Sequence, residues 1–188
     1  MLLKCFVVWA FLFSTVQLFA GIEANSKIIF LGVNAQGHRE LFENIYVKDS
    51  ANAPLDLNLS FDHYQCDDIF KKYYEGRNNP TVNNDLTTKL NEGFDYIIIL
   101  DKDDRIQIYP ELHMETARLI WYHTKEMGSK VVLPMLWNAA DAQAHTSTFE
   151  EHTYRISDAL DIDCVPAGLA WKNILNDSEF ALAFSRDK

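Results

Sequence analysis

Short apolar runs separated by helical patterns are the feature of this sequence that most constrains its fold. The runs 27–32 and 130–137 have the length and composition of strands buried on both faces of a parallel sheet. The run 94–100, Phe-Asp-Tyr-Ile-Ile-Ile-Leu, is the strongest of them and is predicted at the centre of the sheet. Such strands need helices on both faces of the sheet to cover them.

Helical spacing of apolar residues recurs between these strands. The clearest case is 111–127, which Gly128 is expected to end. Its apolar stripe consists of Leu112, Ala117, Ile120, Trp121, Thr124 and Met127. We predict further helices at 38–47, 67–74, 85–91 and 146–160, a helical turn at 169–175, and a surface loop at 76–84.

Two further strands complete the expected sheet. Residues 55–61 alternate apolar and polar side chains, which is typical of a half-buried strand near a sheet edge, and 161–166 predicts a short last strand. Strands that alternate with helices imply right-handed crossovers. The predicted fold is therefore α/β, a three-layer α/β/α sandwich around a mainly parallel sheet of about five strands.

The first 24 residues read as a secretory signal peptide. Lys4 precedes an apolar run that reaches Ala20, and cleavage after Ala20 or Ala24 fits the small residues there. The alternative is a membrane anchor, although Ser14 and Gln17 interrupt the run. We expect a secreted or periplasmic protein without stable membrane insertion after cleavage, in which residues 25–188 form one α/β domain.

Charge and composition exclude some classes of partner. The formal net charge of −10 repels phosphate backbones, so nucleic acid is an unfavourable partner, and a neutral or weakly polar small molecule fits better. His145 and His152 are seven residues apart, but the sequence has no metal-binding or cofactor motif, so we predict neither a metal nor a cofactor. His63, His113 and His123 are predicted to be surface or half-buried residues.

Two cysteines, Cys66 and Cys164, remain after removal of the signal. They form either one disulfide bridge or two buried thiols, and their spacing in the sequence does not decide between these arrangements. The oligomeric state is also left open by the sequence.

Ligands of parallel α/β sheets bind beyond the carboxyl ends of the strands. In this chain these ends are followed by the loops after Leu31, Leu100, Leu136 and Val165. We therefore expect the functional residues in those four loops.

With these loops aligned, the chain resembles the SGNH, or GDSL-like, hydrolases, especially the secreted bacterial members. The resemblance spans nearly all of residues 25–188. It is carried by the strings Ile28-Ile-Phe-Leu-Gly32, Phe94-Asp-Tyr-Ile-Ile-Ile-Leu100, Val131-Val-Leu-Pro-Met-Leu-Trp137, Tyr154-Arg-Ile-Ser-Asp-Ala-Leu160 and Val165-Pro-Ala-Gly-Leu-Ala-Trp171.

The resemblance implies an attacking serine two residues after the glycine of the first turn. In Gly32-Val-Asn34 that position holds Asn34, whose carboxamide cannot form an acyl-enzyme but can donate a hydrogen bond to a carbonyl or a sugar hydroxyl. Asn34 as a plain turn or helix-cap residue is the alternative. Gly32 itself is expected to line the substrate site.

The other family motifs also differ here. The family places a Gly-x-Asn after the central strand to bind the oxyanion, whereas this chain has an acidic cluster that begins at Asp101. Asp101 is expected to contact the substrate, and the alternative is a solvated loop. The resemblance assigns Asp187 to a terminal Asp-x-x-His whose histidine would lie beyond Lys188, so we expect either that the final helix is missing or that the base has been lost. Asp187 as a frayed terminal residue is the other alternative. Trp137 and Asn138 are expected to contact a sugar, or Trp137 to lie in the core.

The function that follows is hydrolysis of acyl or acetyl-carbohydrate esters by an exported SGNH-type protein. The alternative is a non-catalytic relative that binds a carbohydrate or a peptide.

Overall fold

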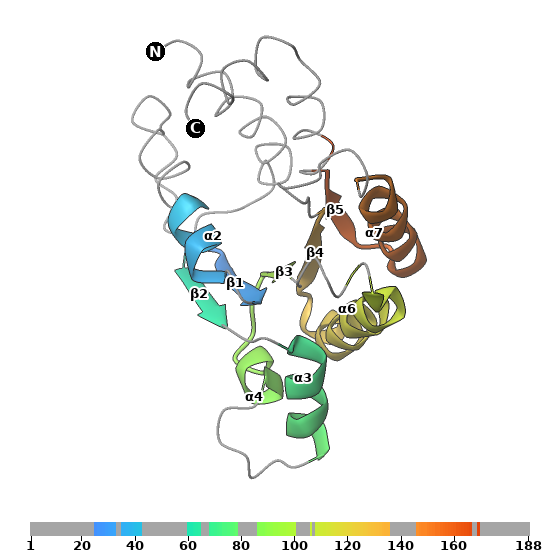
Figure 1. Cartoon of the computed structure of the whole chain (residues 1–188). Helices are drawn as coiled ribbons and strands as arrows, with labels where there is room; N and C mark the ends of the chain where they lie inside the picture. Colours follow the sequence, from blue (N-terminus) through green and yellow to red (C-terminus); the bar gives the residue numbers. More distant parts are fainter. Residues whose placement is uncertain are drawn as a thin grey trace, which may run out of the picture.

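Five parallel strands form the centre of the molecule. The computed structural model describes residues 25–32, 35–42, 60–64, 68–78, 86–100, 106, 108–135, 146–166 and 169. The strands are β1 (Lys27–Gly32), β2 (Ser60–Tyr64), β3 (Tyr96–Leu100), β4 (Lys130–Pro134) and β5 (Asp163–Val165). They pair in the order β2-β1-β3-β4-β5, and every pair is parallel (Figure 1). The predicted parallel sheet is confirmed, with β3 at its centre and β2 at an edge.

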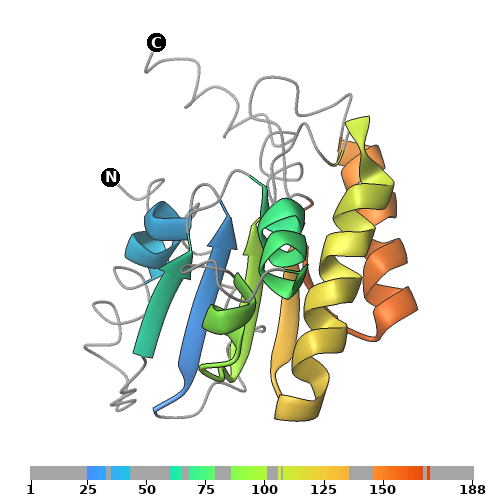
Figure 2. The same cartoon turned by 90° about the horizontal axis from the view of Figure 1, so that it is seen from below.

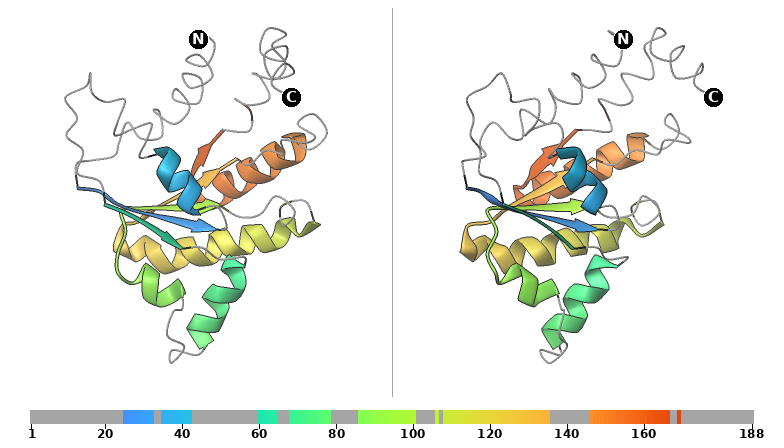
Figure 3. Two further views of the ribbon diagram at one scale, coloured as in Figure 1. Left: turned by 60° about the vertical axis from the view of Figure 1, so that its left-hand side comes forward. Right: turned by 90° about the vertical axis from the view of Figure 1, so that its left-hand side faces the viewer.

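Helices cover the two faces of this sheet unequally. Helix α2 (Ala35–Phe42) lies on one face, and the opposite face carries α3 (Ile69–Asn78), α4 (Leu86–Leu90) and α6 (Pro110–Thr124) (Figures 1 and 3). Helix α7 (Thr146–Leu160) covers the twisted end of the sheet on the side of α6, because Ile156 and Leu160 share one buried cluster with Ile120 of α6. This division follows from right-handed crossovers, because the chain moves one way from β1 to β2 and the other way from β3 to β5. The three-layer α/β/α architecture is confirmed.

The main core lies between the sheet and the helices α3, α4, α6 and α7 that cover one of its faces. Alternate residues of β1 and β3, such as Ile29 and Ile97, are fully buried there against Ile120 of α6 and Ile156 of α7. The residues between them in the strands, such as Ile98, are also buried. Strands enclosed on both faces need apolar side chains at every position, which explains why residues 96–100 of β3 form a continuous apolar run rather than an alternating one.

Several element boundaries differ from the predicted ones. Helix α2 begins at residue 35 instead of 38, and β2 covers 60–64 instead of 55–61, of which 55–59 lie outside the described residues. The predicted loop at 76–84 is wrong for its first three residues, because α3 continues to Asn78. The Asn78 side chain donates a hydrogen bond to the carbonyl of Tyr74 at 2.8 Å. This bond satisfies a last-turn carbonyl and supports a polar final turn.

The end of α6 shows one confirmed and one wrong prediction. Gly128 ends this helical segment in the left-handed conformation, at φ +79°, as predicted. Met127, expected on the buried stripe, is 42% exposed. The reason is that residues 125–127 tighten into a 3₁₀ turn (η3, Lys125–Met127), which has fewer residues per turn and rotates Met127 off the buried face.

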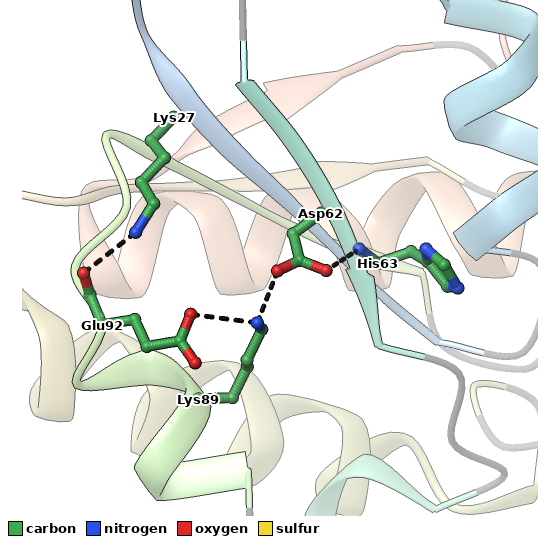
Figure 4. Close-up of polar contacts among 5 residues, drawn as sticks. All are labelled: Lys27, Asp62, His63, Lys89 and Glu92. Carbon is green, nitrogen blue, oxygen red and sulfur yellow. Dashed lines mark hydrogen bonds and ion pairs between the residues drawn. The ribbon is translucent and has the colours of Figure 1, made fainter.

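A charged cluster fixes α4 against the edge strand β2. The ammonium of Lys89 lies 2.5 Å from a carboxylate oxygen of Asp62 and 2.9 Å from one of Glu92 (Figure 4). Lys27 donates to the backbone carbonyl of Glu92 at 3.1 Å, and Asp62 also accepts the backbone N–H of His63 at 2.8 Å. The cluster therefore joins α4 and its following turn to both β1 and β2.

These contacts shift two pKa values. Partial burial acts to raise the pKa of Asp62, but the hydrogen bonds from Lys89 and from the His63 backbone outweigh it, so that the pKa lies below its ordinary value of 3.8. The hydrogen bond to Asp62 raises the pKa of Lys89. The folded state thus favours the ionised pair.

Replacing Asp62 with asparagine is expected to lower the free energy of unfolding at pH 7 by up to about 1 kcal/mol, since the pair is partly exposed and solvent screens it. A lowered pKa in the folded state gives stability that is present above pH 3.8 and is lost as the pH falls through the folded pKa. The free energy of unfolding, measured with urea, should consequently fall less below pH 4 in D62N than in the parent protein.

The matched control for this substitution is E75Q in α3. Glu75 forms only an exposed ion pair with Lys71, at 3.7 Å, so its removal should leave the acid branch of the stability curve unchanged. If the free energy of unfolding falls equally steeply with decreasing pH in D62N and in the parent, the cluster has no stabilising role.

Candidate functional site

The direction of the chain reverses between β1 and β3. From β1 the connection passes through α2 to β2 on one side, while β3 leads through α6 to β4 on the other side. Open parallel sheets bind ligands at this kind of switch point, beyond the carboxyl ends of the strands. The candidate site therefore lies at the ends of β1 and β3, where Gly32 and Leu100 are paired (Figure 2).

Gly32 is the residue at which the two strand ends come closest. Its φ is +137°, a backbone conformation that residues with a side chain rarely adopt. A Cβ atom there would overlap the carbonyl oxygen of Leu100 and lie 2.8 Å from the carbonyl carbon. Strand β1 thus ends directly beside the end of β3, an approach that only glycine permits.

The structure shows how the strand ends that precede the predicted site residues are arranged. Asn34 follows Gly32 by two residues, Asp101 follows Leu100 directly, and β4 pairs with β3 on its other side. The residues Asn34, Asp101, Trp137, Asn138 and Asp187 lie outside the described residues. For all of these residues, and for Gly32 as a ligand contact, the site role stays a prediction.

A second apolar cluster supports the carboxyl side of β4. Ile106, Met135 and Phe149 are buried together, and Cys164 and Leu169 pack against them. The cluster ties the segment after β3 to the residue after β4 and to the first turn of α7. It was not foreseen from the sequence, where Ile106 stands inside a charged segment that gives no helix or strand pattern.

Two exposed apolar side chains follow this cluster along the chain. Ile108 is 62% exposed and Tyr109 is 61% exposed, just before α6 begins at Pro110. The carbonyl of Tyr109 accepts the backbone N–H of Leu112 at 2.9 Å, which fixes the residue to the first turn of the helix. Because α6 runs back along the sheet, its first turn lies at the same end of the sheet as the carboxyl ends of the strands (Figure 2).

Two histidines between α6 and α7 are buried, which corrects one prediction. His113 is 3% exposed instead of being at the surface, and His152 is 6% exposed. Their ring centroids are 5.4 Å apart. His63 is exposed and His123 is half-buried, as predicted, while His145 lies outside the described residues.

The described residues contain no group of three or more His, Cys, Asp or Glu side chains that could hold a metal ion. Within the same ranges, no helix is long and apolar enough to cross a membrane. Cys164 carries a free thiol, and burial raises its pKa to about 11. Cys66 lies outside the described residues, so its state is not decided.

Similarity to known proteins is found in structure and not in sequence. Neither a protein-family model nor a curated protein matches the chain. TesA superposes with a TM-score of 0.53 at 12% identity, over 74% of this chain and 77% of TesA. A variant of an acetyl-xylooligosaccharide esterase from Geobacillus superposes with a TM-score of 0.50 at 10% identity, over 76% of each chain. Both are SGNH-type hydrolases.

This chain has the SGNH hydrolase fold. At such low identity the likeness establishes the fold alone, and the chemistry has to be argued from the residues of this chain. Among the described residues, Gly32 lies at the end of β1 with a positive φ, and its correspondence to the glycine of the SGNH motif stays a prediction.

Proposed function

We propose that this chain is an exported SGNH-type protein whose site takes a small ester, an acyl ester or an acetylated carbohydrate, at the carboxyl ends of β1 and β3. The observation that carries the proposal is the close approach of Gly32 to the Leu100 carbonyl at the switch point. The esterase and hydrolase neighbours support an ester as the ligand class. Residues 1–24, which read as a signal peptide, support export.

The chemistry at this site depends on position 34. Ester hydrolysis by this family's route needs a hydroxyl that attacks the carbonyl carbon and takes on the acyl group. Asn34 has a carboxamide in place of that hydroxyl, and its N–H can instead hydrogen-bond the ester carbonyl. Asparagine at this position specifically favours the second candidate function, binding of the ester or its carbohydrate without turnover.

The two candidate functions are separated by measuring hydrolysis and binding on the same preparation. The full chain is expressed, and the protein that is recovered outside the cells is used for both measurements. A mass that shows the loss of residues 1–24 would support export. Hydrolysis of p-nitrophenyl acetate above the buffer rate would support a hydrolase. Calorimetric binding of acetylated xylooligosaccharides without acetate release would support a binding protein.

Replacing Asn34 with serine supplies the attacking hydroxyl but not its base, because the resemblance places the histidine beyond Lys188. With imidazole added as the base, N34S is expected to release acetate about tenfold or more faster than the parent protein under the same conditions. The matched control is N34A, which removes the carboxamide without adding a nucleophile and should not gain activity. A protein that neither binds nor hydrolyses these esters, with N34S equally inert, would overturn the proposed function.

A further inference from the structure

The pair His113 and His152 lies where α6 and α7 come into contact. His113 stands in the first turns of α6 and His152 in the second turn of α7, and both rings are more than nine-tenths buried. Their centroids are 5.4 Å apart with the ring planes inclined by 39°. Along the chain, α6 is the first helix of more than one turn after β3 and α7 is the helix after β4, so the pair joins the starts of the two helices that follow these strands.

The hydrogen bond from Arg155 requires that His152 is neutral. Its guanidinium Nη2 lies 3.4 Å from Nδ1 of His152 and 3.0 Å from a carboxylate oxygen of Glu111 on α6. A guanidinium can only donate hydrogen bonds, so Nδ1 of His152 has to accept, and only the neutral ring can accept at that nitrogen. Protonation of Nδ1 would break this hydrogen bond, because the guanidinium of Arg155 and the imidazolium of His152 would then both be charged donors that face each other.

The other nitrogen of His152 offers no compensation. Nε2 is buried and no hydrogen bond from the described part of the chain reaches it. A second proton on the ring would therefore place a charge in a poorly solvated position, and a buried charge without a partner costs several kcal/mol. Within the part of the chain that the structure describes, the charged and titratable groups that face His152 are Glu111 and His113 from α6 and Arg155 from its own helix.

We propose that the contact of His152 with His113 and Arg155 is an acid-sensitive clamp, which holds the first turns of α6 and α7 together and opens when His152 takes up a proton. In the open form the imidazolium reaches water and moves away from Arg155. Glu111, the one acidic group in this set, is already paired with Arg155 and is largely exposed, so it offsets the repulsion only in part.

The pKa of His152 agrees with this geometry. Burial lowers it first, and the charge of Arg155 lowers it further, while the charge of Glu111 acts in the opposite direction. A pKa below the ordinary 6.5 in the closed form means that the open form binds more protons. The clamp is therefore fully stable above pH 6.5 and weakens as the pH falls from 6.5 towards the lowered pKa.

Hydrogen exchange of the full chain between pH 7.5 and pH 5.5 tests the clamp directly. After correction for intrinsic exchange rates, the opening equilibrium of residues 110–116 and 146–153 should rise by up to about tenfold per pH unit below pH 6.5, the limit for one linked proton. Exchange in β1 and β3 should show no such rise. A uniform rise over the whole chain, or none in these two helix segments, would overturn the proposal.

Three variants make the test specific to His152. H152L keeps a buried side chain and should abolish the pH-dependent opening, whereas H63Q, at the exposed histidine of β2, should leave it unchanged. If H152L does not fold, R155Q decides, because Arg155 is half exposed and its removal brings the pKa of His152 in the closed form nearer to 6.5. The rise in opening should then still begin near pH 6.5, but it should be smaller and level off at a higher pH than in the parent. An R155Q protein with the parent's pH profile would contradict the proposal.

Discussion

The G32A protein is expected to unfold at a temperature about 6–12 °C below that of the parent, which corresponds to a loss of about 3 kcal/mol in the free energy of unfolding. Two costs add at this position. A side chain is strained at φ +137°, and the added Cβ would overlap the Leu100 carbonyl oxygen, so that β1 and β3 have to separate at their carboxyl ends. Circular dichroism during heating measures the loss.

The matched control for G32A is G37A in α2. A Cβ at position 37 meets no atom within 4 Å, and alanine is the better helix former, so G37A should be as stable as the parent or up to about 1 kcal/mol more stable. Equal unfolding temperatures for G32A and G37A would refute the close approach on which the candidate site depends. Ester binding should fail in G32A even below its unfolding temperature.

Truncation of Phe149 to alanine should cost about 3–5 kcal/mol in the free energy of unfolding. The ring is fully buried and contacts the cluster formed with Ile106 and Met135, so its removal leaves a cavity where the segments after β3 and β4 are held. Urea unfolding followed by tryptophan fluorescence measures this difference.

Tyr154 provides the control on the same helix. Its ring is 38% exposed, so Y154A should cost about 1 kcal/mol or less, although it removes a side chain of nearly the same size. Similar losses for F149A and Y154A would show that the cluster around Phe149 adds nothing beyond the helix itself. F149L, which fills part of the cavity, should recover about half of the loss.

The parts of the fold that were predicted correctly are those whose apolar pattern leaves one solution. Residues 27–32 and 146–160 form a strand and a helix with the predicted bounds, because a short continuous apolar run and a long stripe each fit only one backbone period. The parallel order followed from strands and helices in alternation. The end of α3 was missed because a polar last turn carries no periodic signal and depends on a local hydrogen bond from Asn78.

Long-range contacts between polar groups could not be predicted. Nothing in the sequence indicates that Asp62 contacts Lys89 or that His113 contacts His152. Histidine is of intermediate burial on average, so its type alone does not predict a buried pair. At the candidate site the sequence predicted the position of Gly32 at the end of the first strand, which the structure confirms, but not its contact with the Leu100 carbonyl. The roles of Asn34, Asp101, Trp137, Asn138 and Asp187 remain predictions, since they lie outside the described residues.

The opposite departures of the chain from β1 and β3 divide the rim of the candidate site between two layers of the molecule. One connection leads to α2 and the other to α6 on the far side of the sheet, so the two helices that follow the switch point do not pack against each other (Figure 3). Insertions or substitutions in one layer therefore leave the packing of the other layer intact, and the two sides of the site are free to diverge independently.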